Sequence, residues 1–304
     1  MEIYLPIAEI SMNPIPLLLL GAVVGIISGL FGVGGGFIMT PLLIFIGVPP
    51  AVAVGTQANQ IVGASVSGIS GYWRRRHIDF KMAAVLLGGS LIGSILGVWI
   101  FSFLRQIGQV DLVISILYIV VLGSIGGMML VESVSVILKD RSGVKPRRKL
   151  HRHNWLHGLP FKLRFPRSRL YVSAVVPFAI GFLGGLLVSI LGVGGSFFMI
   201  PAMIYLLEMP PSMVPGTSLV SVLITTGVAT LIHSYTTHTV DIVLAVFLLI
   251  GGGIGAQIGT RFSTRIRGEQ SRALLAAVIL IVALKLLIGL VIRPDNLYSL
   301  IIDG

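Results

Sequence analysis

Cysteine is absent from the sequence, and charged residues are scarce. Without cysteine, the chain forms no disulfide, carries no thiol nucleophile and offers no thiolate to a metal. Lysine, arginine, aspartate and glutamate make up 11% of the residues, whereas a soluble globular domain carries about 25%. Lysine and arginine are missing altogether from residues 1–73. A cleavable signal peptide begins with basic residues, so we expect none here.

Long apolar runs take the place of the missing charges. Hydrophobic residues account for 55% of the chain, and the mean hydropathy is +0.99. Several uncharged runs exceed the roughly 18 residues that indicate a membrane-spanning helix. We therefore expect an all-α polytopic membrane protein with about 8–10 membrane helices.

Two glycine-rich segments interrupt the apolar runs. Residues 31–41 read Phe-Gly-Val-Gly-Gly-Gly-Phe-Ile-Met-Thr-Pro, and residues 191–201 read Leu-Gly-Val-Gly-Gly-Ser-Phe-Phe-Met-Ile-Pro. We call residues 32–36 the first glycine turn and residues 192–196 the second. A short apolar run follows each turn, and the run at 37–46 would cover about 15 Å of a hydrocarbon core about 30 Å thick. The pattern predicts a helix broken near the middle of the membrane.

The sequence divides into two related halves. We expect a first membrane repeat at 1–138, a basic cytoplasmic linker at 139–169 and a second membrane repeat at 170–304. The expected membrane elements are 15–31, 37–46, 51–72, 82–103 and 112–138 in the first repeat, and 170–191, 197–207, 213–235, a segment around 251–259 and 271–292 in the second. Five elements per half is an odd number, which inserts the second half upside down relative to the first. We therefore predict inverted-topology repeats with broken or re-entrant helices.

Glycines also recur at four-residue spacing in matching places of the two halves. They are Gly89, Gly93 and Gly97 in the first half, and Gly251, Gly255 and Gly259 in the second. Such a ridge lets two helix backbones approach closely, so we predict that these glycines serve packing.

The distribution of basic residues supports the expected orientation. Lysine and arginine number four at 73–81, eleven at 139–169 and four at 261–272, but one at 104–110 and none at 236–241. With both termini on the outer face, all three basic segments lie in the cytoplasm. We interpret the linker as an orientation signal and expect anionic lipids to contact it. Nucleic-acid binding is the weaker alternative, and we expect no such partner.

The glycine turns place the amino termini of two short helices inside the membrane. Unpaired N–H groups and the helix dipole favour an anion there. Polar residues on the following helices add donors without a fixed charge, which suits a small oxyanion that must also be released. The predicted substrate-binding residues are Gly32, Gly34, Gly35, Gly36, Thr56, Gln57, Asn59, Gln60, Gly192, Gly194, Gly195, Ser196, Thr217, Ser218 and Ser221. The alternative is that the polar residues only form hydrogen bonds between helices.

Two ionisable residues lie within the predicted spans. Lys285 either attracts the anion or extends to the membrane surface without a role in transport. His233, near a helix end, either carries a proton or is structural. The sequence has no paired carboxylates in the membrane, no His-Glu metal spacing and no nucleophile elbow. We therefore expect no catalytic residue, no metal and no cofactor, and we favour transport over catalysis.

At these residues the chain resembles the TauE/SafE family of sulfite-exporter-like membrane proteins. The resemblance is carried by residues 29–41, 49–50 and 54–56, and by the copies at 192–201 and 214–217. It implies a secondary transporter of small sulfur-containing anions, such as sulfite or organosulfonates, in a bacterial inner membrane. We expect alternating access between the halves, and membrane potential favours export of an anion. The alternatives are an anion channel, or a membrane-embedded enzyme or sensor.

Overall fold

The computed structural model describes residues 3–31, 36–141, 160–263 and 268–291. That part of the chain holds ten helices and two β-hairpins. The predictions for Gly32, Gly34 and Gly35 lie outside the described residues, as do residues 142–159 of the expected linker. Gly36 is the described end of the first glycine turn.

The same series of elements occurs twice along the chain. The first series is β1 (Ile3–Leu5), β2 (Ile10–Met12), α1 (Pro14–Phe31), α2 (Gly36–Phe45), α3 (Pro50–Arg74), α4 (Phe80–Gln106) and α5 (Val110–Arg141). The second is β3 (Lys162–Phe165), β4 (Leu170–Ser173), α6 (Val175–Leu191), α7 (Ser196–Tyr205), α8 (Val214–Thr236), α9 (Ile242–Ser263) and α10 (Gly268–Val291). Each series is therefore a hairpin, a helix, a short helix and three longer helices.

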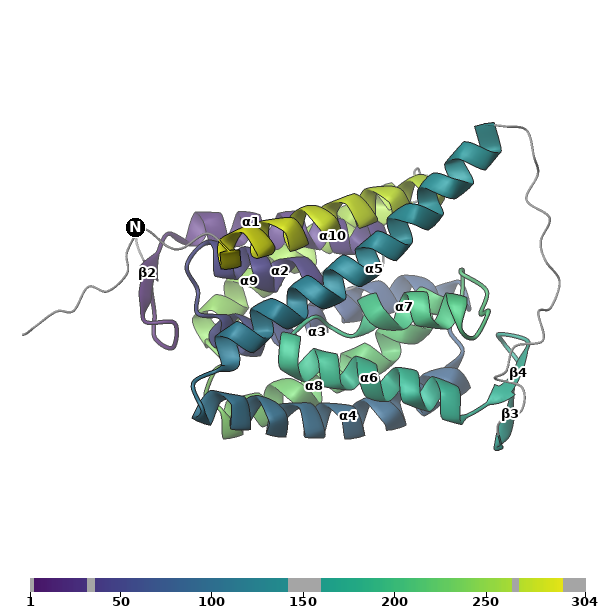
Figure 1. Ribbon diagram of the computed structural model, residues 1–304, viewed down its shortest axis with the longest axis horizontal. Helices are drawn as coiled ribbons and strands as arrows, with labels where there is room; N and C mark the ends of the chain where they lie inside the picture. Colours follow the sequence, from purple (N-terminus) through teal and green to yellow (C-terminus); the bar gives the residue numbers. More distant parts are fainter. Residues whose placement is uncertain (1–2, 32–35, 142–159, 264–267, 292–304) are drawn as a thin grey trace, which may run out of the picture.

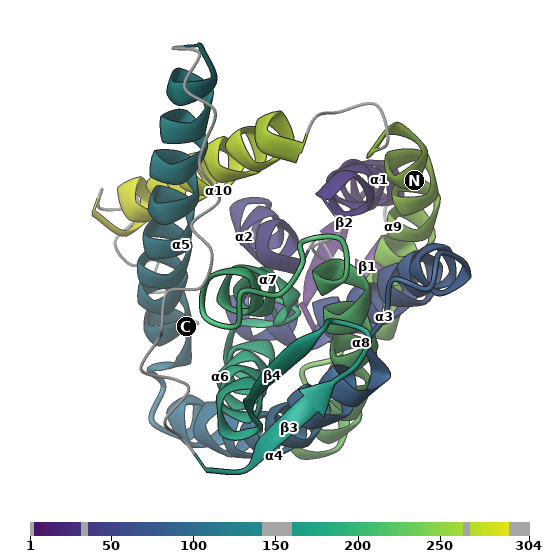
Figure 2. The same cartoon turned by 90° about the vertical axis from the view of Figure 1, so that its right-hand side faces the viewer.

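The two hairpins lie at opposite ends of the helix bundle (Figure 1). Viewed along the long axis, the short helices α2 and α7 lie near the centre, with the longer helices around them (Figure 2). Five helices, α4, α5, α8, α9 and α10, contain stretches long and apolar enough to cross a membrane. The all-α polytopic fold class is confirmed, while the inverted orientation of the halves relative to a membrane stays a prediction.

The hairpins are the feature that the sequence analysis missed. A helix was expected over 170–191, but residues 170–173 form β4, and α6 begins only at Val175. β3 and β4 pair antiparallel, with Lys162 opposite Ser173. The strands are three or four residues long, so their alternation is too short to stand out beside long apolar runs.

Each hairpin closes the start of a long helix in the other half. Asp79, the N-cap of α4, accepts hydrogen bonds at Oδ2 from the backbone N–H and the hydroxyl of Ser168, at 2.9 and 2.7 Å. Ser168 lies in the turn between β3 and β4. In the equivalent place before α9, Asp241 Oδ2 accepts from the N–H groups of Ile7 and Ala8, in the turn between β1 and β2, at 3.0 and 3.4 Å. The two halves are thus joined by reciprocal caps.

The glycine ridges serve packing, as predicted. A Cβ added to Gly89 would lie 2.1 Å from the carbonyl oxygen of Phe178 on α6, and one on Gly93 would lie 2.0 Å from that of Phe182. On α9, a Cβ at Gly255 would lie 2.1 Å from the carbonyl oxygen of Ala22 on α1. Helices α4 and α6, and likewise α9 and α1, are therefore in backbone contact that a side chain at these positions would prevent.

Replacing Asp79 by alanine should destabilise the protein by about 2–4 kcal/mol. Loss of the helix cap typically costs about 1 kcal/mol. The buried donors of Ser168 would also lose their acceptor, at a further cost of about 1–3 kcal/mol. Thermal unfolding in detergent measures the change. The control is Asn13→Ala, which removes an exposed cap whose Oδ1 accepts from the N–H of Ile15 at 3.1 Å. Equal losses in the two variants would contradict the role of the hairpin.

Candidate functional site

The second glycine turn needs glycine for its backbone shape. Helix α6 ends at Leu191, and Gly192 follows in the left-handed region with φ +67°. Gly194 is also left-handed, with φ +75°. A side chain is strained in this region. The turn redirects the chain so that α7 begins at Ser196, deep among other helices.

The described parts of the two glycine turns meet inside the protein. A Cβ on Gly36 would lie 2.6 Å from the carbonyl oxygen of Val193. The side chain of Ile61 contacts both turns, because its Cδ1 would lie 2.7 Å from a Cβ on Gly36 and 2.8 Å from one on Gly194. The rings of Phe37 and Phe197 stack with their centroids 5.4 Å apart.

This stacking brings the amino termini of α2 and α7 side by side. Phe37 and Phe197 are each the second residue of their helix. A helix amino terminus carries about half a positive charge. Two such ends, buried together away from water, repel one another, and an anion between them would remove that repulsion.

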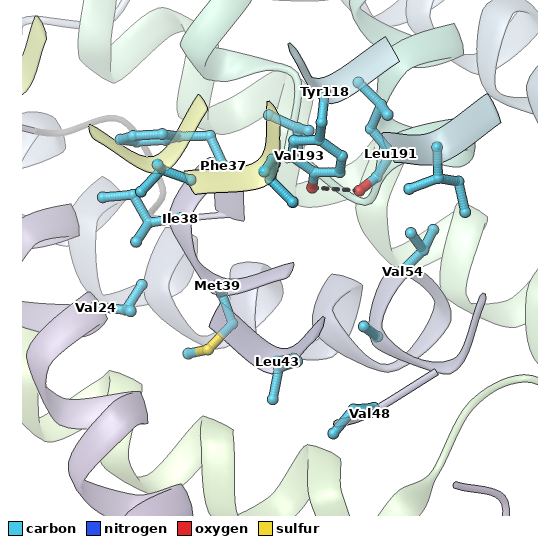
Figure 3. Close-up of a cluster of buried hydrophobic side chains, with 14 of the residues drawn as sticks. Val24, Phe37, Ile38, Met39, Leu43, Val48, Val54, Tyr118, Leu191 and Val193 are labelled. Atoms are coloured by element: carbon cyan, nitrogen blue, oxygen red, sulfur yellow. Dashed lines mark hydrogen bonds between the residues drawn. The ribbon is translucent and has the colours of Figure 1, made fainter. Parts of the chain in front are cut away.

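Side chains from α3 and α5 hold the turns in place. Tyr118 on α5 donates its hydroxyl hydrogen to the carbonyl oxygen of Leu191 at 2.6 Å, within the buried cluster that also contains Phe37 and Val193 (Figure 3). Gln57 Nε2 donates to the carbonyl oxygen of Gly36 at 2.6 Å, and Gln57 Oε1 accepts from the hydroxyl of Thr40. Gln57 was predicted to contact substrate, but its amide is occupied in supporting α2.

Gln60 is the predicted site residue whose side chain remains available. It is 1% exposed, and neither its Nε2 nor its Oε1 has a hydrogen-bond partner among the described residues. Gln60 precedes Ile61, which touches both glycine turns, and its amide lies against Gly252 on α9. An unpartnered buried amide costs about 1–3 kcal/mol. This buried amide, one residue from a side chain that touches both turns, is therefore the strongest sign of a ligand position among the predicted residues.

A route to the protein surface begins at Ala64, one helix turn beyond Gln60 on α3. Ala64, Gly68 and Tyr72 follow Gln60 at four-residue intervals on one side of α3. They line a narrow cavity of about 20 Å³, and a single water needs about 10–15 Å³ of such space. Gly68 and Tyr72 also line a pocket of about 560 Å³, which opens at the surface. We call this larger pocket the mouth.

The equivalent positions along α8, on α4, α6 and α8, are closed by hydrogen bonds. Ser94 lies 15 residues after Asp79, and Ala256 lies 15 residues after Asp241, so the two are counterparts. Ala256 lines the narrow cavity, whereas Ser94 exchanges a hydrogen bond with Ser189 at 2.8 Å.

Three more contacts complete this closed cluster. Ser90 hydrogen-bonds Thr225 at 2.6 Å, and His233 Nε2 lies 2.9 Å from the carbonyl oxygen of Ser189. The ring of His233 also meets the edge of Phe101, with 4.8 Å between centroids. Counted from the equivalent threonines Thr56 and Thr217, Thr225 is the counterpart of Ala64, and His233 that of Tyr72. The route is therefore open along α3 and sealed along α8. We call Ser90, Ser94, Ser189, Thr225 and His233 the polar seal.

The remaining polar candidates are engaged away from the helix ends. Thr56 Oγ1 accepts from the N–H of Asp241 at 2.9 Å, and Thr217 Oγ1 accepts from the N–H of Asp79 at 3.0 Å. These threonines therefore support the reciprocal caps and do not face the glycine turns. Asn59, Ser218 and Ser221 donate to the carbonyl oxygens of Thr56, Pro215 and Ala83, respectively.

Lys285 lies on an exposed face of α10. Its Nζ sits 4.2 Å from the ring centroid of Phe45, the last residue of α2. Gly36 and the stacked rings are at the other end of that helix, about 13 Å away by helix rise. The contact ties α10 to α2, and it does not place the ammonium at the glycine turns. Among the described residues, no three histidine, aspartate or glutamate side chains lie close enough to hold a metal.

Comparison with known proteins identifies the class as membrane transporters. The family model described as Sulfite exporter TauE/SafE matches residues 17–286. A probable membrane transporter protein, YjnA, of Bacillus subtilis is 30% identical over 275 residues, covering 90% of this chain and 99% of its own. Another from the same organism, YunE, is 25% identical over 91% of this chain and 98% of its own. An Arabidopsis thaliana protein, Sulfite exporter TauE/SafE family protein 3, is 31% identical over 38% of this chain and 25% of its own.

No solved structure matched the chain. The chain is a multi-pass membrane protein and belongs to the TauE/SafE family. The resemblance drawn from the glycine turns is thus confirmed.

Gly36→Ala should push the two turns apart and destabilise the protein by about 1–3 kcal/mol, the usual cost of overpacking. The added methyl would meet the carbonyl oxygen of Val193 and the side chains of Gln57 and Ile61. The matched control is Gly227→Ala on α8, where nothing lies within 4 Å of the added Cβ. There the better helix propensity of alanine should stabilise by up to about 1 kcal/mol. Unfolding midpoints in detergent compare the two, and a Gly36→Ala protein as stable as the control would refute the close contact.

Proposed function

We propose that the protein is a secondary transporter that exports small sulfur-containing oxyanions, such as sulfite or organosulfonates, across a bacterial inner membrane. The anion binds beside Gln60, between the amino termini of α2 and α7. The halves give access to this position alternately from the two faces of the membrane.

The observation that carries the proposal is the buried, unpartnered amide of Gln60, which directly precedes Ile61, the residue that touches both glycine turns. Nε2 offers two donors, and the helix ends offer positive potential without a fixed charge. A sulfonate or sulfite oxygen accepts hydrogen bonds from such groups. Because no full positive charge faces the anion there, binding stays weak enough for release.

The energetics of the membrane favour the outward direction. With the cell interior negative, one anionic charge that leaves gains about 2.3 kcal/mol per 100 mV. A monoanion therefore needs no coupling ion to exit. The mouth lies at the end of the molecule where arginines gather, and the positive-inside rule assigns that end to the cytoplasm.

The difference between the two routes supports alternating access. The mouth and narrow cavity describe a state open on the cytoplasmic side, while the polar seal closes the other side. To change from this state to one open on the outer side, the protein must break the hydrogen bonds of the polar seal while the mouth narrows.

Gln60→Leu should weaken sulfite binding about 10- to 100-fold, because hydrogen bonds to a charged group contribute about 1.5–3 kcal/mol. Leucine keeps the volume and removes an unpaired polar group, so the melting temperature should stay the same or rise. Calorimetry on the purified protein and flux of ³⁵S-labelled sulfite into proteoliposomes measure the effect. Gln106→Leu, at an exposed position, is the control. A Gln60→Leu protein with parental affinity would remove Gln60 from the site.

Single cysteines report on alternating access, because the chain has no cysteine of its own. Gly68 lines the mouth, and its counterpart Ala229 is 1% exposed. If the outward state is populated at about 0.1–10%, Ala229→Cys should react with an impermeant thiol reagent about 10- to 1,000-fold more slowly than Gly68→Cys. Sulfite should then shift the two rates in opposite directions. A channel would instead show both rates rising together and no counterflow.

A further inference from the structure

The mouth is lined by three arginines. Arg74 and Arg75 come from the end of α3, and Arg261 comes from the last turn of α9. Tyr72 and Thr260 also line the mouth, and no carboxylate is among its described lining residues. The volume of about 560 Å³ falls within the range of small-ligand pockets, about 300–1,000 Å³. Figure 2 looks onto this end of the molecule, where β3 and β4 also lie.

We propose that the mouth is a separate capture site for the anion, which binds the arginines before it moves along α3 to Gln60. This inference rests on the proposed function and adds a second binding position to it. Gln60 and Tyr72 are separated by twelve residues of helix, about 18 Å by helix rise. The two positions are therefore distinct. The narrow cavity adjoins the mouth, and the lining residues that the two have in common are Gly29, Gly68, Tyr72 and Thr260.

Guanidinium groups suit this task. They bind oxyanions through paired N–H donors, which gives the same geometry for sulfite, sulfonates and phosphates. A pocket of one charge sign with low-dielectric walls raises the local concentration of an anion, and such steering accelerates association by about 10- to 1,000-fold.

The opposite end of the molecule has no comparable pocket of arginines among its described residues. Arg105, at the end of α4, donates to the carbonyl oxygen of Thr237 and so supports the loop before α9. The positive potential therefore gathers on the side where the route is open. This asymmetry points to loading from the mouth and release from the other side.

The test measures sulfite uptake into inverted membrane vesicles, whose cytoplasmic face is outside. The triple variant Arg74→Gln, Arg75→Gln, Arg261→Gln should raise KM about tenfold at low ionic strength and change kcat less than twofold. The same positions changed to lysine should keep KM within about threefold of the parent, since the charge remains. Addition of 0.5 M potassium gluconate should raise the KM of the parent close to that of the glutamine triple variant, because the Debye length falls to a few ångströms and the arginine charges are screened.

Arg76→Gln is the matched control. Arg76 adjoins Arg75 in sequence and carries the same orientation charge, but it does not line the mouth. If Arg76→Gln and the glutamine triple have equal KM values, the arginines serve only membrane orientation and the proposal is wrong. Size-exclusion chromatography in detergent checks that each variant is folded. If the triple variant is unstable, the three single variants replace it, and the KM increase of each should exceed that of Arg76→Gln.

The lipid composition separates a free anion from a phospholipid headgroup in the mouth. Purified protein is assayed in vesicles of phosphatidylcholine alone and with phosphatidylglycerol. A tenfold KM effect in phosphatidylcholine alone supports capture of the free anion. An effect that requires phosphatidylglycerol means that the arginines bind lipid, and it overturns the proposal. If the parent binds and transports no sulfite or organosulfonate in any vesicle, the proposed function itself is wrong, whereas a transporting parent with unaffected variants overturns only the capture site.

Discussion

The structure depends on one constraint: a helix broken inside a membrane must have its bare backbone groups covered by protein. Here each break covers the other. Gly36 lies against the carbonyl oxygen of Val193, and the stacked rings of Phe37 and Phe197 fix the two helix starts side by side. Tyr118 supplies a partner for the last carbonyl group of α6. The surrounding helices can then be ordinary apolar spans, because the groups that lipid would not tolerate are gathered at the centre.

Joining the halves at their centre requires that they also be held at their ends. The hairpins do this through carboxylates that accept backbone N–H groups from the other half. Leu5 and Phe165 add an apolar contact, since each is buried in a hydrophobic cluster with the helices. Thr56 and Thr217 extend the same arrangement, since each accepts the N–H of the aspartate that caps the other half's helix. Such contacts are directional and local. They hold the ends while leaving the routes beside α3 and α8 free to differ. Thr225 and Ser94 stand where the open route has alanines, His233 stands where it has Tyr72, and their hydrogen bonds close the second route.

Much of this arrangement was predictable from the sequence. The glycine turns, the short helices after them and the boundaries of most long helices follow from composition and spacing, and helix ends agree within a few residues. The hairpins could not be predicted, because strands of three or four residues show too little alternation of polar and apolar residues beside long apolar runs. The sequence also put Thr56, Gln57 and Gln60 in one set of predicted binding residues without distinguishing their neighbours. Only the fold shows that Gln57 supports Gly36 while the amide of Gln60 is unpartnered among the described residues. Tyr118 gave no sequence signal, since one tyrosine in an apolar helix is unremarkable.

In the proposed function, Gln60 explains how a site built from neutral groups would bind an anion and still release it. Without a ligand, its amide has lost its hydration and gained no partner, which raises the free energy of the empty state by about 1–3 kcal/mol. The amino termini of α2 and α7 raise the free energy of the empty state further by mutual repulsion. In this proposal, an anion relieves both costs at once, so part of its binding energy would come from strain already present in the empty protein. The attraction does not rely on a buried full charge, whose desolvation is far more expensive and whose hold on the anion would oppose release. The arginines, which are full charges, lie instead at the surface, where water keeps their attraction reversible.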